Sequence, residues 1–281
     1  MHIFRLPGSN RLRKIRVLAV MFLAVAGILT VATYASRGRG VQANRKVKLS
    51  VQDPRPLAKA IETLESRNGW IITYEDPRYV NESEIADVTA SVRRDLNNFK
   101  AGEAPKVLIP KGGPLSIEYE VDPTTNNPAD STRVVQQLLD AQSRSGNAGK
   151  FRLERNGEVI HVIPTAVKNT AGVLAPQESV LDAVISIPAE DRTGMQLLDA
   201  ICVSVSQATE TRVVVGTIPL NLFFSRRTQR GAASQKARDV LATMLGDIKS
   251  GTSLSWQLFY DPGMKIYALN IHQVRLSNAI S

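Results

Sequence analysis

Two stretches of the chain repeat one order of local patterns, and this recurrence is the feature that most restricts the fold. Residues 131–163 and 234–271 each read as a capped amphipathic helix, a short glycine-containing turn and a β-hairpin. Asn156-Gly157 is a strong hairpin signal in the first stretch, and Asp261-Pro262-Gly263 takes its place in the second. With the segments upstream, each half reads strand–helix–strand–strand–helix–strand–strand. The sequence therefore predicts an α+β fold of two tandem, two-layer modules.

The first module is predicted over residues 47–164. Pro56 can open its first helix, and Gly69 can end that helix in a left-handed conformation. Asp130 or Ser131 caps the second helix, whose apolar positions recur at helical spacing. The first helix is predicted over Leu57–Arg67. The predicted strands are Val47–Val51, Trp70–Tyr74, Leu115–Val121, Phe151–Glu154 and Val159–Ile163.

A long insertion is predicted inside the first module, over residues 79–114. Apolar residues from Ile85 to Phe99 recur at helical spacing. The pattern predicts an amphipathic helix over Glu82–Phe99.

The second module is predicted over residues 180–276, after a linker over residues 165–179 that holds Ala, Gly and Pro. Thr193 caps its first helix, and Ser234 precedes its second. The predicted strands are Val184–Pro188, Val213–Val215, Leu222–Phe224, Leu254–Tyr260 and Ile266–Ile271.

Residues 1–35 carry the pattern of a signal peptide or a membrane anchor. Basic residues between Arg11 and Arg16 precede an apolar run, Val17–Thr33, and no further charge occurs before Arg37. Positive charges stay on the cytoplasmic side while an apolar segment of this kind enters the membrane. The pattern predicts a chain that is exported across a membrane or held in it.

The fate of this leader is left open by the sequence. A small-x-small cleavage site could end at Ala35 or at Ala43, or the segment could remain as a transmembrane helix. Residues 36–46 read as a basic linker. We expect the rest of the chain to be periplasmic, exported or anchored in the inner membrane by residues 17–35.

The positive charge of the chain belongs to its N-terminal part. The 281 residues hold 35 Lys plus Arg and 26 Asp plus Glu, a formal net charge of +9, but residues 1–50 contain ten basic residues and no acidic one. Nucleic-acid binding needs concentrated Lys and Arg, so we expect no nucleic-acid partner. The single cysteine, Cys202, excludes an intramolecular disulfide and a cysteine-rich zinc site, and no cofactor is expected.

The first half carries a family-like pattern: Leu49-Ser50-Val51-Gln52-Asp53-Pro54-Arg55-Pro56-Leu57, then Ala60-Ile61, Leu64 and Gly69-Trp70-Ile71-Ile72-Thr73-Tyr74. This stretch resembles the opening of the secretin and TonB N-terminus short domain. In that family a short strand is followed by a Pro-Leu step into a helix with leucine pairs, a glycine turn and a strand. A second helix then leads to a final hairpin, as residues 134–163 would here.

The resemblance covers residues 46–164, and residues 180–272 are similar to the neighbouring periplasmic domains of secretins. It departs from the family at the insertion over 79–114, and no pore sequence follows before Ser281. The resemblance implies docking modules without a channel, which contact partner proteins by docking or strand addition and catalyse no reaction.

Candidate chemical side chains are few and isolated. His161 and His272 lie in the last strand of each half, with no other ligand at metal-binding spacing. Alternation puts His161 on the face opposite Ile160 and Val162, so we expect it to face solvent or lie at an edge. Cys202 lies on the apolar stripe of a helix and is expected to be a buried small hydrophobe.

Two further patterns are expected to have structural roles. Glu118 and Glu120 share one strand face, which predicts a solvated sheet surface instead of a catalytic pair. Lys111-Gly112-Gly113 lacks the spacing of a phosphate loop and reads as a turn.

Arg226, Arg227 and Arg230 form a basic cluster in the predicted second module. They are expected to lie in a solvated loop or to contact an acidic partner or lipid headgroups. Taken with the resemblance, the sequence predicts a non-enzymatic envelope protein that binds an envelope partner in a secretin- or TonB-linked secretion or transport assembly. An envelope enzyme with an unrecognised site, a structural or ligand-binding periplasmic protein, and a homo-oligomer remain open.

Overall fold

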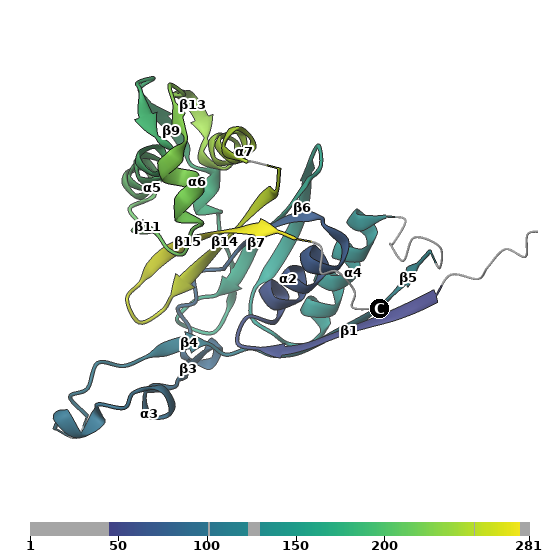
Figure 1. Ribbon diagram of the computed structural model, residues 1–281. Coiled ribbons are helices and arrows are strands. Elements are labelled where there is room, and N and C mark those ends of the chain that lie inside the picture. The colour runs from purple at the N-terminus through teal and green to yellow at the C-terminus, as the bar shows by residue number, and fades with distance from the viewer. Residues whose placement is uncertain (1–44, 101, 123–129, 250, 276–281) are drawn as a thin grey trace, which may run out of the picture. The chain divides into compact units, whose positions relative to one another are not determined.

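A mixed seven-stranded sheet runs through the protein in the computed structural model, which describes residues 45–275 apart from 101, 123–129 and 250 (Figure 1). Its strands follow the order β11-β15-β14-β2-β7-β6, and β8 pairs with β7 beside this path. The strands are β2 (Ile71–Glu75), β6 (Lys150–Asn156), β7 (Val159–Lys168), β8 (Leu174–Pro176), β11 (Val213–Val215), β14 (Ser253–Asp261) and β15 (Ile266–Val274). The α+β class predicted from the sequence is confirmed. The expected leader over 1–35 lies outside the described residues.

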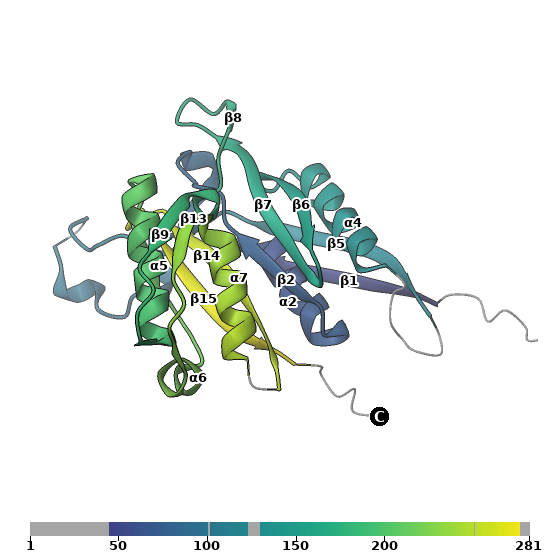
Figure 2. The same ribbon diagram turned by 90° about the horizontal axis from the view of Figure 1, so that it is seen from above.

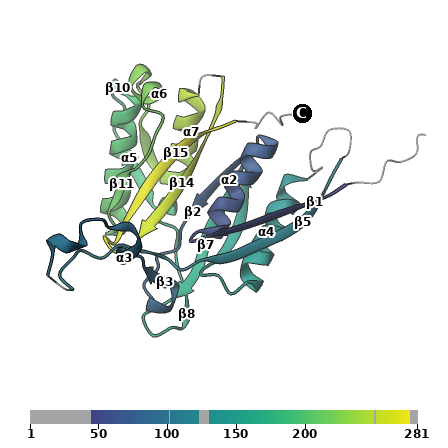
Figure 3. The ribbon, with the colours of Figure 1, turned by 60° about the horizontal axis from the view of Figure 1, so that its bottom comes forward.

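In the first half, two helices lie between the main sheet and a separate two-stranded ladder (Figure 3). The helices are α2 (Pro56–Asn68) and α4 (Ser131–Arg144), and the ladder pairs β1 (Arg45–Asp53) antiparallel to β5 (Gly113–Val121). Pro56 lies in the first turn of α2, Gly69 caps it with φ 69°, and the Asp130 carboxylate caps α4. These predicted helix ends are confirmed.

The second half has the same arrangement. Helices α5 (Gly194–Thr209) and α7 (Ala237–Ile248) lie side by side over β14 and β15 (Figure 2), and they also pack against an antiparallel ladder of β9 (Val184–Ile187) and β13 (Ala232–Lys236). The predicted cap at Thr193 is confirmed as a complete capping box with Gln196.

The strand pairing also recurs. In the main sheet β2 runs parallel to β7, which is antiparallel to β6, and β11 runs parallel to β15, which is antiparallel to β14. The correspondence extends to single hydrogen bonds. The Ile72 amide donates to the Glu65 side chain at 3.1 Å, and the Val213 amide donates to the Ser206 hydroxyl at 2.8 Å. Glu65 of α2 therefore corresponds to Ser206 of α5, and Ile72 of β2 corresponds to Val213 of β11. Since the two spacings are equal, the residues between them correspond one to one.

The two halves share the main sheet but bury different faces of it. Strand β14 runs parallel to β2, with Gln257 opposite Tyr74 and Leu258 opposite Glu75. Tyr74 belongs to the hydrophobic core around α2 and α4, whereas Leu258 belongs to the core around α5 and α7. Neighbouring residues of a strand point to opposite faces, so the helix pairs cover opposite faces of one sheet.

The segment expected as a linker, residues 165–179, is instead held largely to the sheet. Strand β7 continues to Lys168, and β8 pairs back onto it with Ala166 opposite Pro176. Val167 points inward and is buried, which holds this segment against the second core.

The predicted helix over Glu82–Phe99 is wrong. The segment contains only short pieces: η1 (Glu82–Glu84), β3 (Ile85–Asp87), α3 (Thr89–Val92) and η2 (Leu96–Asn98), before β4 (Leu108–Pro110) pairs with β3. The side chains of Asn81 and Asp87 accept hydrogen bonds from nearby backbone amides, which competes with a continuous helix. Residues 85–110, apart from 101, project away from the sheet as an arm (Figure 1). Ile85 at its base packs on the second core, but the other predicted apolar positions of the helix belong to neither core.

The strand predicted over Leu222–Phe224 is also wrong, because these residues form helix α6 (Leu220–Ser225). Phe223 is fully buried while Leu220 and Phe224 are more than half exposed. One buried side chain per turn suits a short helix, whereas three consecutive apolar letters are equally typical of a strand.

Candidate functional site at the junction of the halves

Two consecutive carboxylates, Glu75 and Asp76, lie where β2 meets β14, and both are fully buried. The apolar strand before them carries them into the interior. The Asp76 amide also donates to the Leu258 carbonyl at 2.8 Å and extends the pairing of the strands. Burying a charge is costly unless it is paired, and each carboxylate binds a different arginine.

Glu75 faces the second half. Its carboxylate accepts hydrogen bonds from Arg238 Nη2 at 2.9 Å, Ser179 Oγ at 2.6 Å and the Val180 amide at 2.9 Å. Burial raises the pKa of Glu75, and the Arg238 guanidinium opposes that rise. Arg238, on α7, also donates from Nε to Asp182 at 3.1 Å, so one buried arginine holds two acids on different segments.

Asp76 faces the first core. Arg55 Nε lies 2.6 Å from its carboxylate, the Tyr74 hydroxyl donates at 2.8 Å, and the Tyr260 amide donates at 3.0 Å. Arg55 also donates to the Tyr260 carbonyl at 2.8 Å, so it contacts both halves. Burial raises the pKa of Asp76, opposed by Arg55, and desolvation raises the pKa of Tyr74 well above its usual value.

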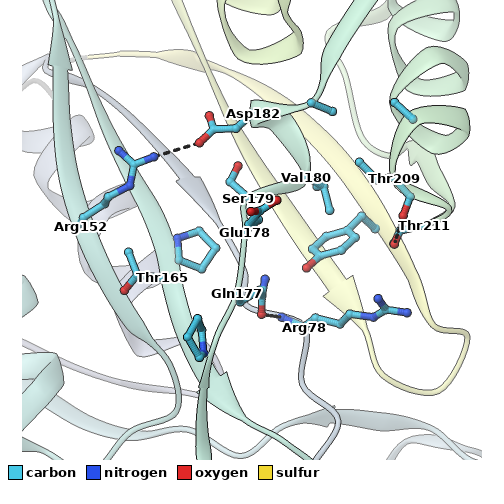
Figure 4. A pocket seen from close by; sticks show the side chains of 15 residues that line it. Arg78, Arg152, Thr165, Gln177, Glu178, Ser179, Val180, Asp182, Thr209 and Thr211 are labelled. Atoms are coloured by element: carbon cyan, nitrogen blue, oxygen red, sulfur yellow. Dashed lines mark hydrogen bonds and ion pairs between the residues drawn. The ribbon is translucent and has the colours of Figure 1, made fainter.

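Beside this network lies a pocket of about 870 Å³ (Figure 4). Its lining combines charged, amide and hydroxyl side chains with two prolines and a tyrosine. Arg152 and Asp182 point toward one another at 2.9 Å, and the Arg78 amide donates to Gln177 Oε1 at 2.7 Å. Its charged, amide and hydroxyl lining residues include Arg78, Arg152, Gln177, Glu178, Ser179 and Asp182.

Ser179 borders the pocket but is not arranged as a nucleophile. Its hydroxyl donates to Glu75 and accepts from Arg238 Nη2 at 2.6 Å. A nucleophilic serine needs an oriented base and a free lone pair aimed at substrate, whereas this hydroxyl bridges an ion pair. The contacts therefore support a structural role for Ser179.

The expectation that His161 faces solvent is wrong. The residue is 1% exposed, hydrogen-bonded through Nδ1 to Thr73 Oγ1 at 2.7 Å, and its ring centroid lies 5.5 Å from that of Trp256. Burial lowers its pKa to about 4, and the nearby Arg238 charge acts in the same direction. Alternation along the strand predicts that this face is solvated, but the second half covers it at this point.

His272 joins the two halves on the opposite face. Its Nε2 lies 2.8 Å from the Glu65 carboxylate of α2, in a pocket of about 520 Å³ that Glu62 and Arg275 also line. Burial tends to lower the pKa of His272, but the hydrogen bond to Glu65 and the charges of Glu65 and Glu62 outweigh it, so the pKa is raised. Glu65 thus binds a strand amide in its own half and an imidazole in the other.

Two structural expectations hold, whereas the turn predicted at Lys111-Gly112-Gly113 does not, because Gly113 already belongs to β5. Cys202 is buried, and burial raises its pKa to about 12, so its thiol is a hydrophobic group at neutral pH. Glu118 and Glu120 lie on the exposed face of β5. At Gly112 a Cβ atom would lie 2.2 Å from the Asp53 carbonyl oxygen, so this glycine allows close backbone packing.

The arginine cluster has internal partners in part. Arg227 binds Asp191 at 2.6 Å and Arg230 binds Asp247 at 2.6 Å, while the Arg226 carbonyl accepts from the Gly194 amide. Both ion pairs are exposed. The three residues lie around the short strand β12 (Arg227–Thr228), which pairs with β10 (Arg192–Thr193) at the start of α5.

No group of three or more His, Cys, Asp or Glu side chains could hold a metal ion within the parts of the chain that the structure covers. None of the helices in the described residues is both long enough and apolar enough to cross a bilayer. Residues 17–35 lie outside the described residues.

Sequence reasoning missed the residues that dominate this site: Arg55, Glu75, Asp76, Ser179 and Arg238. Two signals were available. An acidic pair directly follows an apolar strand, and an arginine interrupts the apolar start of a helix at Ala237-Arg238. Each marks a buried charge in need of a partner, but neither identifies the partner.

Comparison with known proteins found no match to a family model, to a curated protein or to a solved structure.

Proposed function

We propose that this chain is a non-enzymatic cell-envelope protein whose two α+β modules mediate protein–protein contact in a secretin- or TonB-linked assembly. In this proposal residues 47–164 are related to the secretin and TonB N-terminus short domain, and residues 180–276 form a second module of similar build. Residues 17–35 direct export or anchor the chain in the inner membrane, and the modules are periplasmic.

The order of elements supports the proposed relationship. A strand, a Pro-initiated helix, a left-handed glycine at Gly69, a strand, a second helix and a hairpin follow one another in the first half. These are the elements that the sequence resemblance requires. Their recurrence in the second half supports a pair of related modules.

The observation that carries the interaction role is the projecting arm, residues 85–110. Its base is the β3–β4 ladder, which the bond from the Val107 amide to Thr89 Oγ1 at 2.8 Å extends, and farther along the arm the Arg93 guanidinium lies 4.9 Å from the Phe99 ring centre. Val92, in α3 of the arm, is 56% exposed. A self-supported projection with an exposed apolar side chain is suited to contact another protein.

The test removes the tip and keeps the rest of the fold. Residues 89–106 are replaced by Asn-Gly, a two-residue turn that can close the ladder beyond Val88 and Val107. Envelope extracts are passed over the immobilised parent and arm-deleted proteins, with thermal unfolding as the control for folding. We expect a specific envelope protein to be retained by the parent and lost with the arm. Equal retention by both, or retention of no specific protein by the parent, would contradict the proposed role.

A narrower variant sharpens this test. Val92→Glu changes one exposed apolar side chain, and Lys100→Glu changes an exposed basic residue elsewhere on the arm as a matched control. Loss with Val92→Glu alone would place the contact on the exposed apolar side chain of α3. Loss with Lys100→Glu alone would show that charge, not apolar contact, binds the partner.

A second candidate function is ligand binding in the pocket of Figure 4. The pocket is large enough for a small molecule and has Arg78, Arg152, Glu178 and Asp182 in its lining. Titration with small carboxylates and amines, followed by calorimetry, tests it. Binding that is lost in Arg152→Ala would favour this role, and no heat with either class would count against it.

A further inference from the structure

The joint between the halves uses two particular sheet edges. The outer edge of β14, the hairpin strand of the second half, pairs with the outer edge of β2, the first sheet strand of the first half. By the recurrence of the fold, β6 corresponds to β14 and β11 corresponds to β2. These are the two ends of the main sheet, and no strand within the described ranges pairs with either outer edge.

The strand directions match as well. Strand β14 is parallel to β2 in the joint. The pairings through β7 and β15 make β6 and β11 both antiparallel to β2, so they run in the same direction. Suppose that a second copy of the chain lies beside the first in the same orientation, displaced perpendicular to the strands. Its β11 then runs parallel to β6 of the first copy.

The same correspondence fixes the register. In the second half, Leu258 and Val215 both lie opposite Leu269, one on each side of it. In the first half, Leu153 and Tyr74 both lie opposite Val162 in the same way. Leu153 thus corresponds to Leu258, and Val215 corresponds to Tyr74. Since the joint sets Gln257 against Tyr74, a second copy would set Val215 against Arg152 of the first.

The charges at this position are complementary. In the joint, Gln257 Nε2 donates to the Ala58 carbonyl of α2 at 3.4 Å. The residues equivalent to Gln257 and Ala58 are Arg152 and Asp199, both exposed in this chain; Arg152 also forms ion pairs with Asp182 and Glu154 of its own chain. Val203, equivalent to Glu62 on the same side of the helix, is 54% exposed. The open ends therefore carry an opposite-charge pair and an exposed apolar residue at positions equivalent to the joint.

We propose that copies of this chain associate head to tail, with β6 of one copy pairing parallel to β11 of the next and Arg152 facing Asp199 of that copy. A contact between two different surfaces repeats into a ring or a filament. At the open end, Gly216 and Thr217 stand where β2 carries Glu75 and Asp76. The contact therefore lacks the buried carboxylates of the internal joint and is a reversible association. It goes beyond the envelope partner proposed above.

Disulfide trapping tests the register. In full-length protein with Cys202→Ala, one copy carries Arg152→Cys and a second carries Val215→Cys, and the two are mixed and oxidised. We expect a cross-linked dimer, and a ladder of larger species when both substitutions lie in one chain. Asn156→Cys with Val215→Cys is the out-of-register control. Cross-linking no greater than in this control would overturn the proposal.

The Arg152→Cys substitution removes the proposed contact between Arg152 and Asp199. A second, independent test therefore measures this contact by exchanging the two charges. Sedimentation of the otherwise unmodified chain should show a mass that rises with concentration. Asp199→Arg should move the distribution toward monomer, and Asp199→Arg with Arg152→Asp should restore it. A monomer at every concentration would mean that the charges on β6 protect an edge from pairing. That result would overturn the self-association and leave the envelope-partner proposal standing.

Discussion

The two halves of the protein repeat one pattern of strands and helices, but they differ at the edge that accepts another strand. In the first half, Glu75 and Asp76 at the end of β2 bind Arg238 and Arg55, and Glu65 of the adjacent helix α2 binds His272. In the second half the equivalent positions hold Ser206, Gly216 and Thr217. Three carboxylates therefore distinguish the edge that is occupied within the chain from the edge that no described strand of the same chain occupies, on otherwise matching backbones.

The comparison separates what makes the fold from what makes the joint. Ser206 replaces Glu65 in the bond to the strand amide, so that part of the fold needs only an acceptor. The second Glu65 oxygen, by contrast, binds His272 of the other half. Substitutions at the joint should thus affect how the halves hold together more than how each is folded.

The largest effect is expected when the Glu75–Arg238 pair is broken from one side. Arg238→Met leaves a buried carboxylate without its counter-charge, which costs about 3–5 kcal/mol of unfolding free energy. The double change Glu75→Leu with Arg238→Met removes both charges and should cost less than Arg238→Met alone. Urea unfolding monitored by circular dichroism measures both. An effect of Arg238→Met no larger than that of an exposed arginine substitution would refute the importance of this pair.

A second large effect concerns acid. His161 is held neutral with a pKa of about 4, whereas in the unfolded chain it takes up a proton near its ordinary value of 6.5. Its contribution to stability is therefore complete above pH 6.5 and is lost as the pH falls toward 4. The loss is about 3 kcal/mol in total. His161→Asn, which can keep the bond to Thr73, should flatten stability over this range; an unchanged pH profile would argue against a neutral buried imidazole.

A smaller effect of opposite sign is expected from His272. Its pKa is raised by Glu65, so its contribution is complete below pH 6.5 and is lost as the pH rises through the folded-state pKa. The pair is partly exposed, which limits its worth to about 1 kcal/mol or less. His272→Gln should remove this part of the pH dependence in urea unfolding, and Gln273→Ala is the neighbouring control. A stability loss in His272→Gln that is independent of pH would point to packing instead of charge.

The smallest effect is expected at the surface. Arg227 and Asp191 form an ion pair in full contact with solvent, and such pairs contribute little to folding. Arg227→Ala should leave the unfolding midpoint within the error of the measurement. A clear loss would show that the β10–β12 pairing depends on this pair.

Local patterns predicted the elements that have a core to face. Alternation identified β5, whose alternate residues pack on α2 and α4, and the capping residues Thr193 and Asp130 identified helix starts. The same reasoning failed over Glu82–Phe99, because only Ile85 of the predicted apolar positions packs against a core, and the rest lie in the projecting arm.

The junction could not be predicted, because its partners are distant in the chain. Glu75 and Arg238 are 163 residues apart, and which strand lies beside β2 is decided by the docking of the second half. The wrong prediction for His161 has the same origin, because the sequence does not show that the second half packs on this strand. Its side chain is on the face that alternation assigned to solvent, and Trp256 of the other half buries it.

The most direct test of the central claim uses the one tryptophan of each half, Trp70 and Trp256. In Trp70→Phe the fluorescence reports on the second half, and in Trp256→Phe it reports on the first. If the buried carboxylates unite the halves, fluorescence and far-UV circular dichroism will give one coincident urea transition within each variant. Two separated transitions, with one half unfolding while the other remains folded, would contradict the account.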